Sequence, residues 1–305
     1  MRDFGKIFVL ALIFGALGAA DSAYGRLNVV ASTPNYGAIA EAVGGERVQV
    51  RTLARGGEDP HFVTPRPSFI PILNRADVLI ESGAELEIGW LPPLVQSARN
   101  RKIIAGADGH IELARSIDLL DVPTGRVDRR SGDIHLAGNP HFLLDPLNGG
   151  IAAEAIVETF VKLDPEGEEI YRENLRNFLA TLEEKMQGWK EALADYDGTE
   201  IVTYHKNFNY FARRFGIEIV GEVEPLAGVE PSPRHIASLI SRMRSREVPM
   251  LWIESHRPRR TPVRVADQTG AVLVTLPEQV GGVKEADDYF ALIDFIVTQI
   301  VEAGS

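Results

Sequence analysis

The feature that most restricts the fold of this chain is a segment without proline, Glu166–Ala194, just past its middle. Leucine and aromatic residues recur in it at helical spacing, and glutamate, lysine and arginine fill the opposite face. A helix of about 30 residues would be roughly 45 Å long, which exceeds the width of one small domain. We therefore expect a helix that spans two lobes; the alternative is two helices broken near Gly188.

Short apolar runs alternate with helical segments on both sides of this helix, and such alternation indicates parallel sheets covered by helices. The predicted strands are Leu27–Ala31, Val48–Leu53, Val78–Glu81 and Lys102–Ala105 in the first half, and Glu200–Tyr204, Glu218–Gly221, Met250–Glu254 and Ala271–Leu276 in the second. The predicted fold class is α/β, with two similar lobes, each a mostly parallel sheet covered by helices, bridged by one long helix. We place the N-terminal lobe at residues 26–164, the helix at 165–196 and the C-terminal lobe at 197–305.

Residues 1–25 have the layout of a secretory signal peptide. Arg2 and Lys6 precede an apolar run, Ile7–Ala20, which is followed by small residues. The run is shorter than the roughly 20 apolar residues that a membrane-spanning helix needs, so an uncleaved anchor is the weaker alternative. The chain has no cysteine, which excludes disulfides, thiolate metal sites and a lipid attached through cysteine. We expect a periplasmic protein without a lipid anchor.

The charge of the chain argues against nucleic acid as a partner. The formal net charge is −11, and no basic patch is concentrated in any segment. An acidic balance favours the approach of cations, although net charge mainly reports solubility.

Three histidines, His61, His141 and His205, lie in stiff or strand-end contexts. His61 and His141 directly follow proline, and His205 directly follows a predicted strand. Imidazole is the commonest metal ligand among side chains, and ligands of open α/β sheets bind beyond the carboxyl ends of the strands. We therefore expect the three rings to form one metal site between distant segments. Glu278 lies at a comparable position past the last predicted strand. The alternative is that these are ordinary surface or packing histidines.

The other four histidines have weaker contexts. His110, His235 and His256 lie in polar segments, and we expect them to be solvated. His135 leaves two alternatives open, a spare ligand on a mobile loop or a simply exposed side chain.

The chain resembles the zinc- and manganese-specific solute-binding proteins of ABC importers, of the periplasmic high-affinity zinc-uptake type. The resemblance covers essentially the whole mature chain and rests on short motifs in the same order. They are Glu58-Asp59-Pro60-His61 with Pro67-Ser68 and Ala76–Ile80 after it; Asn139-Pro140-His141 continuing to Pro146; and Tyr204-His205 with Tyr210-Phe211-Ala212, Phe215-Gly216 and Pro231-Ser232-Pro233 downstream.

The resemblance implies two lobes bridged by a rigid helix, with the metal held in the cleft between them. It places histidine ligands at His61, His141 and His205, and its fourth position, an aspartate or glutamate in some members and water in others, falls best on Glu278. The family's zinc members often carry a histidine-rich loop before the second ligand. The corresponding segment here, Asp108–Gly138, contains only two histidines.

Three imidazoles and one carboxylate suit Zn²⁺, whereas Mn²⁺ prefers more oxygen donors. We therefore expect a zinc-binding protein that delivers its ion to an ABC importer, with a manganese-binding member of the same family as the alternative. We expect no enzyme, because the chain has no His-Glu-x-x-His motif. An exported zinc hydrolase and a surface adhesin or scaffold are the competing classes.

The expected partner is the membrane permease of the importer, and a periplasmic metallochaperone is a further candidate for loading the site. The chain has no phosphate-binding Gly-x4-Gly-Lys-Ser/Thr motif, so any ATP-driven step belongs to other subunits. We expect the protein to be a monomer.

Overall fold

The structure is a computed structural model that describes residues 25–123, 135–225 and 228–305. The predicted signal peptide lies outside the described residues, except for Gly25. Within the described ranges no helix is long and apolar enough to cross a membrane.

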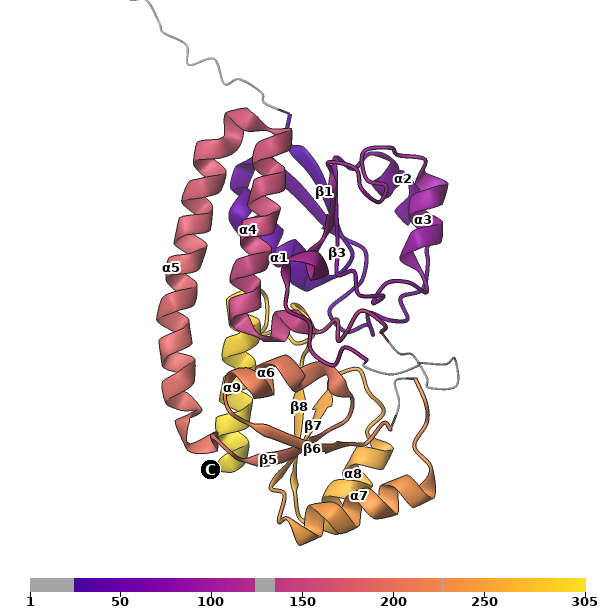
Figure 1. The fold of residues 1–305 in the computed structure, drawn as a ribbon, viewed down its shortest axis with the longest axis vertical. Coiled ribbons are helices and arrows are strands. Elements are labelled where there is room, and N and C mark those ends of the chain that lie inside the picture. The colour runs from indigo at the N-terminus through magenta and orange to yellow at the C-terminus, as the bar shows by residue number, and fades with distance from the viewer. Residues whose placement is uncertain (1–24, 124–134, 226–227) are drawn as a thin grey trace, which may run out of the picture.

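The N-terminal lobe is built on a four-stranded parallel sheet in the order β2-β1-β3-β4 (Figure 1). Its strands are β1 (Leu27–Ala31), β2 (Val48–Thr52), β3 (Val78–Glu81) and β4 (His110–Glu112). The C-terminal lobe repeats this order as β6-β5-β7-β8. Its strands are β5 (Glu200–Thr203), β6 (Glu218–Glu222), β7 (Met250–Glu254) and β8 (Val272–Leu276).

The prediction of a strand at Lys102–Ala105 is wrong, because β4 lies further along the chain. Residues 101–107 form turns, and the apolar pair at their centre is divided between core and solvent: Ile103 is fully buried and Ile104 is largely exposed. The backbone N–H of Leu79 in β3 instead donates to the carbonyl of Gly109, which leads the chain into the ladder with β4.

Helices cover both faces of each sheet. In β1, Val29 packs into the core under α1 (Pro34–Gly44) and α4 (Pro146–Leu163), and Val30 packs under α2 (Phe69–Asn74) and α3 (Leu91–Ala98). This alternation is what a strand with both faces covered requires. The C-terminal sheet is covered in the same way by α6 (Asn209–Arg214) and α9 (Tyr289–Gly304) on one face, and by α7 (Pro233–Ser245) and α8 (Arg260–Thr269) on the other.

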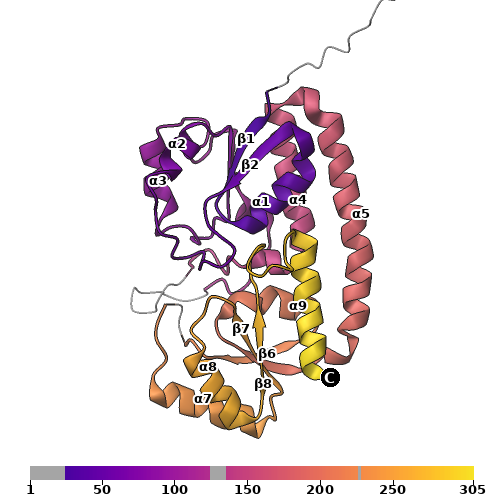
Figure 2. The same cartoon turned by 180° about the vertical axis from the view of Figure 1, so that it is seen from behind.

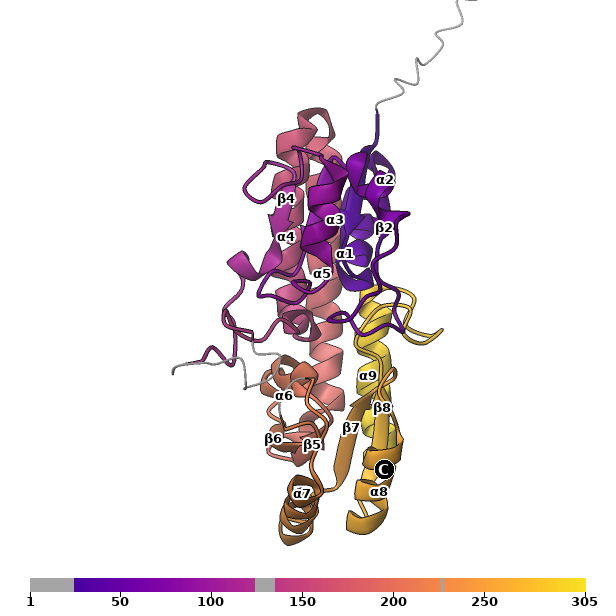
Figure 3. The same ribbon diagram turned by 90° about the vertical axis from the view of Figure 1, so that its right-hand side faces the viewer.

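One helix joins the two lobes, as predicted. α5 (Glu168–Ala192) runs for 25 residues through Gly188 without a break, and it lies along one side of both lobes (Figures 1 and 2). Phe178 packs into the core of the N-terminal lobe, whereas Met186 and Trp189 pack into that of the C-terminal lobe. Figure 3 shows the stacked lobes from the side. A packed helix of this kind restricts how far the lobes can separate.

Direct contacts also hold the lobes together near the carboxyl ends of their strands. The guanidinium of Arg214 in α6 forms a bidentate ion pair with Asp145, in which Nε donates to Oδ1 at 2.8 Å and Nη2 donates to Oδ2 at 2.7 Å. The hydroxyl of Tyr210 donates to the carbonyl of Asn139 at 2.7 Å.

Gly56, in the loop after β2, brings the two backbones into contact. A Cβ on Gly56 would lie 2.3 Å from the carbonyl carbon of Gly281 in the other lobe, whereas a Cβ on Gly57 would have nothing within 4 Å. We expect Gly56→Ala to lower the free energy of unfolding by about 1–3 kcal/mol, the usual cost of overpacking. Gly57→Ala is the matched control in chemical denaturation. Equal stability of the two variants would contradict this contact.

Candidate metal centre

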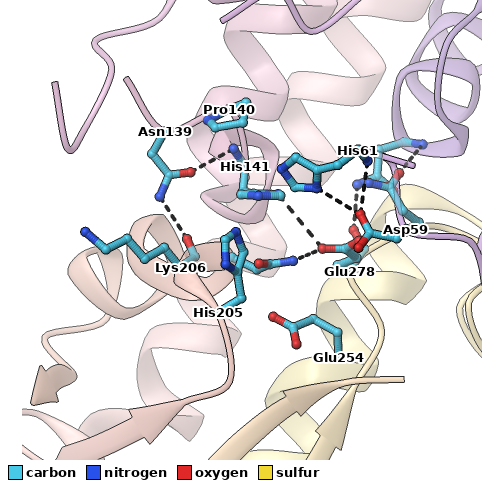
Figure 4. A network of polar contacts seen from close by, with 12 residues as sticks. Asp59, His61, Asn139, Pro140, His141, His205, Lys206, Glu254 and Glu278 are labelled. Carbon is cyan, nitrogen blue, oxygen red and sulfur yellow. Dashed lines mark hydrogen bonds and ion pairs between the residues drawn. The ribbon is translucent and has the colours of Figure 1, made fainter. Parts of the chain in front are cut away.

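The three predicted histidines all lie in connections that follow strands, and their side chains converge at the junction of the lobes (Figure 4). His61 lies in the loop after β2, and His141 lies in the connection between β4 and α4, both in the N-terminal lobe. His205 follows β5 directly in the C-terminal lobe. The parallel sheets therefore present them in the crevice where α/β proteins bind ligands.

The imidazole rings of His61, His141 and His205 converge. One ring nitrogen from each lies within 4.8 Å of the others, and the three residues are 7 %, 7 % and 5 % exposed. Their ring centroids are 5.0–5.7 Å apart. Among the described residues no other group of three or more acidic or histidine side chains meets this spacing.

The same local turn presents both histidines of the N-terminal lobe. In Asp59-Pro60-His61 the carboxylate of Asp59 accepts the backbone N–H of His61 at 3.0 Å. In Asn139-Pro140-His141 the amide oxygen of Asn139 accepts the backbone N–H of His141, also at 3.0 Å. Asp and Asn favour this turn because their side chains reach the backbone two residues on, and proline fixes the residue between.

Carboxylates lie behind two of the rings. Asp59 Oδ1 lies 2.8 Å from His61 Nδ1, and Glu224 Oε2 lies 2.7 Å from His205 Nδ1. A carboxylate that accepts from Nδ1 fixes the tautomer in which Nε2 carries the lone pair that a metal needs. His141 Nε2 is buried and has no hydrogen-bond partner among the described residues.

The surroundings favour the neutral form of His141 and His205. Burial, followed by the proximity of His61 and His205, holds the pKa of His141 well below its ordinary value. Burial also lowers the pKa of His205, although Glu224 opposes the shift. A neutral imidazole is the form that binds metal, so these two rings are ready to bind at neutral pH.

Glu278 lies beside the three histidines but outside their 4.8 Å group. It is 3 % exposed, and its Oε2 lies 3.9 Å from His141 Nδ1. Burial raises the pKa of its carboxyl. The amide of Asn35 in α1 donates to the Glu278 carbonyl at 2.9 Å and accepts from Val280 N at 2.8 Å. The loop after β8 is thus tied to the opposite lobe.

Two of the histidines expected in solvent are buried, so that prediction is wrong for them. The ring of His256 is 8 % exposed and lies 3.7 Å from Asp59 and 3.8 Å from Glu278. The ring of His110 is 6 % exposed and lies 2.7 Å from Glu81. Local polarity could not show that other segments close over these rings. For His256, its position just past β7 was the available signal.

His235 and His135 have partners as well. His235 is partly exposed, and its Nε2 lies 2.9 Å from the carbonyl of Glu222. The Nε2 of His135 lies 3.1 Å from that of His61. Burial, followed by the proximity of His61 and His205, lowers the pKa of His135 to about 3. His135 therefore lies at the edge of the cluster as a neutral ring.

Two stacked α/β lobes with histidines converging between them define a solute-binding protein with a metal site. Residues 29–303 match the family described as zinc-uptake complex component A, periplasmic (ZnuA), and the chain belongs to this family.

Similar proteins carry names with different metals. The chain is 27% identical over 323 residues to the manganese ABC transporter substrate-binding lipoprotein PsaA of Streptococcus anginosus, with 100% of both chains covered. It is 27% identical over 291 residues to the iron ABC transporter substrate-binding lipoprotein MtsA of Streptococcus pyogenes serotype M1, covering 91% of this chain and 88% of the relative.

Solved structures share the fold. The crystal structure of ZnuA superposes with a TM-score of 0.76 at 23% identity, covering 92% of this chain and 100% of the other. The Mn-bound periplasmic metal binding protein from Candidatus Liberibacter asiaticus has a TM-score of 0.75 at 23% identity, covering 90% and 98%.

The protein is therefore an extracytoplasmic, metal-binding substrate-binding protein of an ABC transporter, and not an enzyme. Such proteins work with membrane permease and ATPase components. The hydrolase alternative has no support from the comparisons. The names of the relatives include the word lipoprotein, so the expected absence of a lipid anchor has no support from them either.

Proposed function

We propose that the protein captures Zn²⁺ between its lobes and delivers it to the permease of an ABC importer. The Nε2 atoms of His61, His141 and His205 are the proposed ligands, with the Glu278 carboxylate in the fourth position. The observation that carries this proposal is the convergence of three buried imidazoles from both lobes within 4.8 Å. Three nitrogen donors and one carboxylate form a four-coordinate shell suited to zinc.

Manganese is the second candidate, and the names of the relatives support it. Mn²⁺ prefers carboxylate, carbonyl and water oxygen, however, whereas imidazole suits zinc. In the proposed shell Glu278 would be the only oxygen donor.

Binding would cross-link the lobes, because the ligands come from both. The packing of α5 on both lobes, together with the Gly56–Gly281 contact, favours a change in the loops around the ion over a wide hinge motion. Release would then require the permease to disturb these loops. The organisation that goes with this function is a signal peptide at 1–25, lobes at 26–164 and 197–305, and a joining helix at 165–196.

The cellular context is part of the same proposal. A cleavable signal peptide and the absence of cysteine favour a periplasmic protein without a lipid anchor. We expect a monomer, with a periplasmic metallochaperone as a candidate partner for loading the site.

The choice of metal is tested on metal-free protein with a chromophoric chelator as competitor. We expect one equivalent of Zn²⁺ to bind at least about tenfold more tightly than Mn²⁺, since nitrogen-rich sites follow the order of divalent-metal affinities. Equal or tighter binding of Mn²⁺ would make this a manganese protein of the same family.

A further inference from the structure

A largely buried arginine of the C-terminal lobe lies near the histidine cluster. Arg257 follows β7, and its side chain is 12 % exposed. Its guanidinium Nη1 lies 3.3 Å from Asp59 Oδ2 and 4.0 Å from Glu224 Oε1. Its Nε lies 3.6 Å from Glu254 Oε2, and the guanidinium lies over the ring of Tyr204, 5.3 Å from the centroid.

Two of these carboxylates are the ones that lie behind the metal-site rings. Asp59 contacts His61 Nδ1 in the N-terminal lobe, and Glu224 contacts His205 Nδ1 in the C-terminal lobe. The Arg257 guanidinium therefore lies between two carboxylates, each of which contacts an imidazole of a different lobe. The Nε2 of His256 also lies near Asp59, at 3.7 Å.

The charge of Arg257 matters because the carboxylates around it are largely shielded from solvent. Asp59, Glu224 and Glu254 all lie within 4.0 Å of its guanidinium, with side chains that are 16 %, 7 % and 0 % exposed. A buried anion that loses its counter-ion is strongly destabilised in its place, so we expect it to move. Such a movement would take the carboxylate away from the imidazole that it contacts. Arginine suits the position because its planar guanidinium stays charged and can contact two acceptors at once.

We infer that Arg257 is a positioning residue for the metal site, which holds Asp59 where it accepts the Nδ1–H of His61 and holds Glu224 next to His205 Nδ1. Both Nε2 lone pairs then face the space between the lobes. This inference rests on the proposed metal function, since it assigns a role toward the same three histidines.

The test is zinc affinity, measured by chelator competition, in Arg257→Met and Arg257→Lys. We expect Arg257→Met to bind zinc up to about 10- to 100-fold more weakly, because the loss of a carboxylate partner of a metal ligand costs about that much and Arg257 holds two such carboxylates. Arg257→Lys keeps the positive charge but not the planar guanidinium that contacts two acceptors, so we expect a smaller loss of affinity. Arg260→Met, an exposed position at the start of α8, is the matched control and should bind like the parent.

The tautomers of the rings distinguish a positioning role of Arg257 from a purely structural one. Imidazole ¹H–¹⁵N spectra of the metal-free parent should show His61 and His205 protonated at Nδ1, and Arg257→Met should show mixed tautomers. In a double-mutant cycle, Arg257→Met should lower the zinc affinity less in an Asp59→Asn background than in the parent, because Arg257 acts on the site partly through Asp59.

Folded Arg257→Met and Arg257→Lys proteins with parental zinc affinity and unchanged tautomers would overturn the inference. If Arg257→Met does not fold, the lysine variant alone decides by the same two measurements. Failure of the parent itself to bind zinc would instead overturn the proposed function.

Discussion

Replacement of His61, His141 or His205 by alanine, one at a time, is expected to lower the affinity for Zn²⁺ at least about 100-fold. Loss of an outer partner of a metal ligand already costs about 10- to 100-fold, and loss of the ligand itself removes a bond to the ion. Competition titration with a chromophoric chelator measures the loss.

His235→Ala is the matched control for this series. His235 lies in α7 with its Nε2 against the carbonyl of Glu222, and it takes no part in the histidine group. Its replacement should leave the zinc affinity unchanged. The site assignment would be wrong if the three site variants bound zinc as the control does.

Zinc is expected to stabilise the metal-free protein by about 4 kcal/mol when the free ion is 1,000-fold above its dissociation constant. The reason is that the ion binds the assembled site but has no comparable site in the unfolded chain. For a chain of this size the melting temperature should rise by roughly 10 °C. Differential scanning calorimetry in the presence and absence of zinc measures the shift.

The variant with alanine at His61, His141 and His205 together should show no such shift at the same zinc concentration. A shift of equal size in this triple variant would mean that zinc stabilises the protein from another place. The absence of any shift in the parent would contradict tight binding to the folded state.

The fold could be predicted from the sequence because its main signals are local. Strand–helix alternation gave seven of the eight strands to within one residue at each end, and the segment Glu166–Ala194 gave the joining helix. The fourth strand was misplaced because an apolar pair at Ile103 marks a buried turn as readily as a strand. Only the pairing of the chain past Gly109 with β3 distinguishes the two.

The site was predictable in part. Its three histidines were found because proline or a strand end positions each of them, which is again local information. Their surroundings were missed, since the contacts of Asp59, His256 and Arg257 arise only when loops from both lobes meet. Glu278 stays a predicted ligand, and its Oε2 lies next to the histidine group, 3.9 Å from His141 Nδ1.

The central claim is that one cation is bound by imidazoles from both lobes. Crystals of the zinc-loaded protein, measured on both sides of the zinc absorption edge, test it most directly. We predict a single strong anomalous peak about 2.0–2.1 Å from a ring nitrogen of each of His61, His141 and His205. A peak bound by the residues of one lobe alone, or located away from these rings, would contradict the claim.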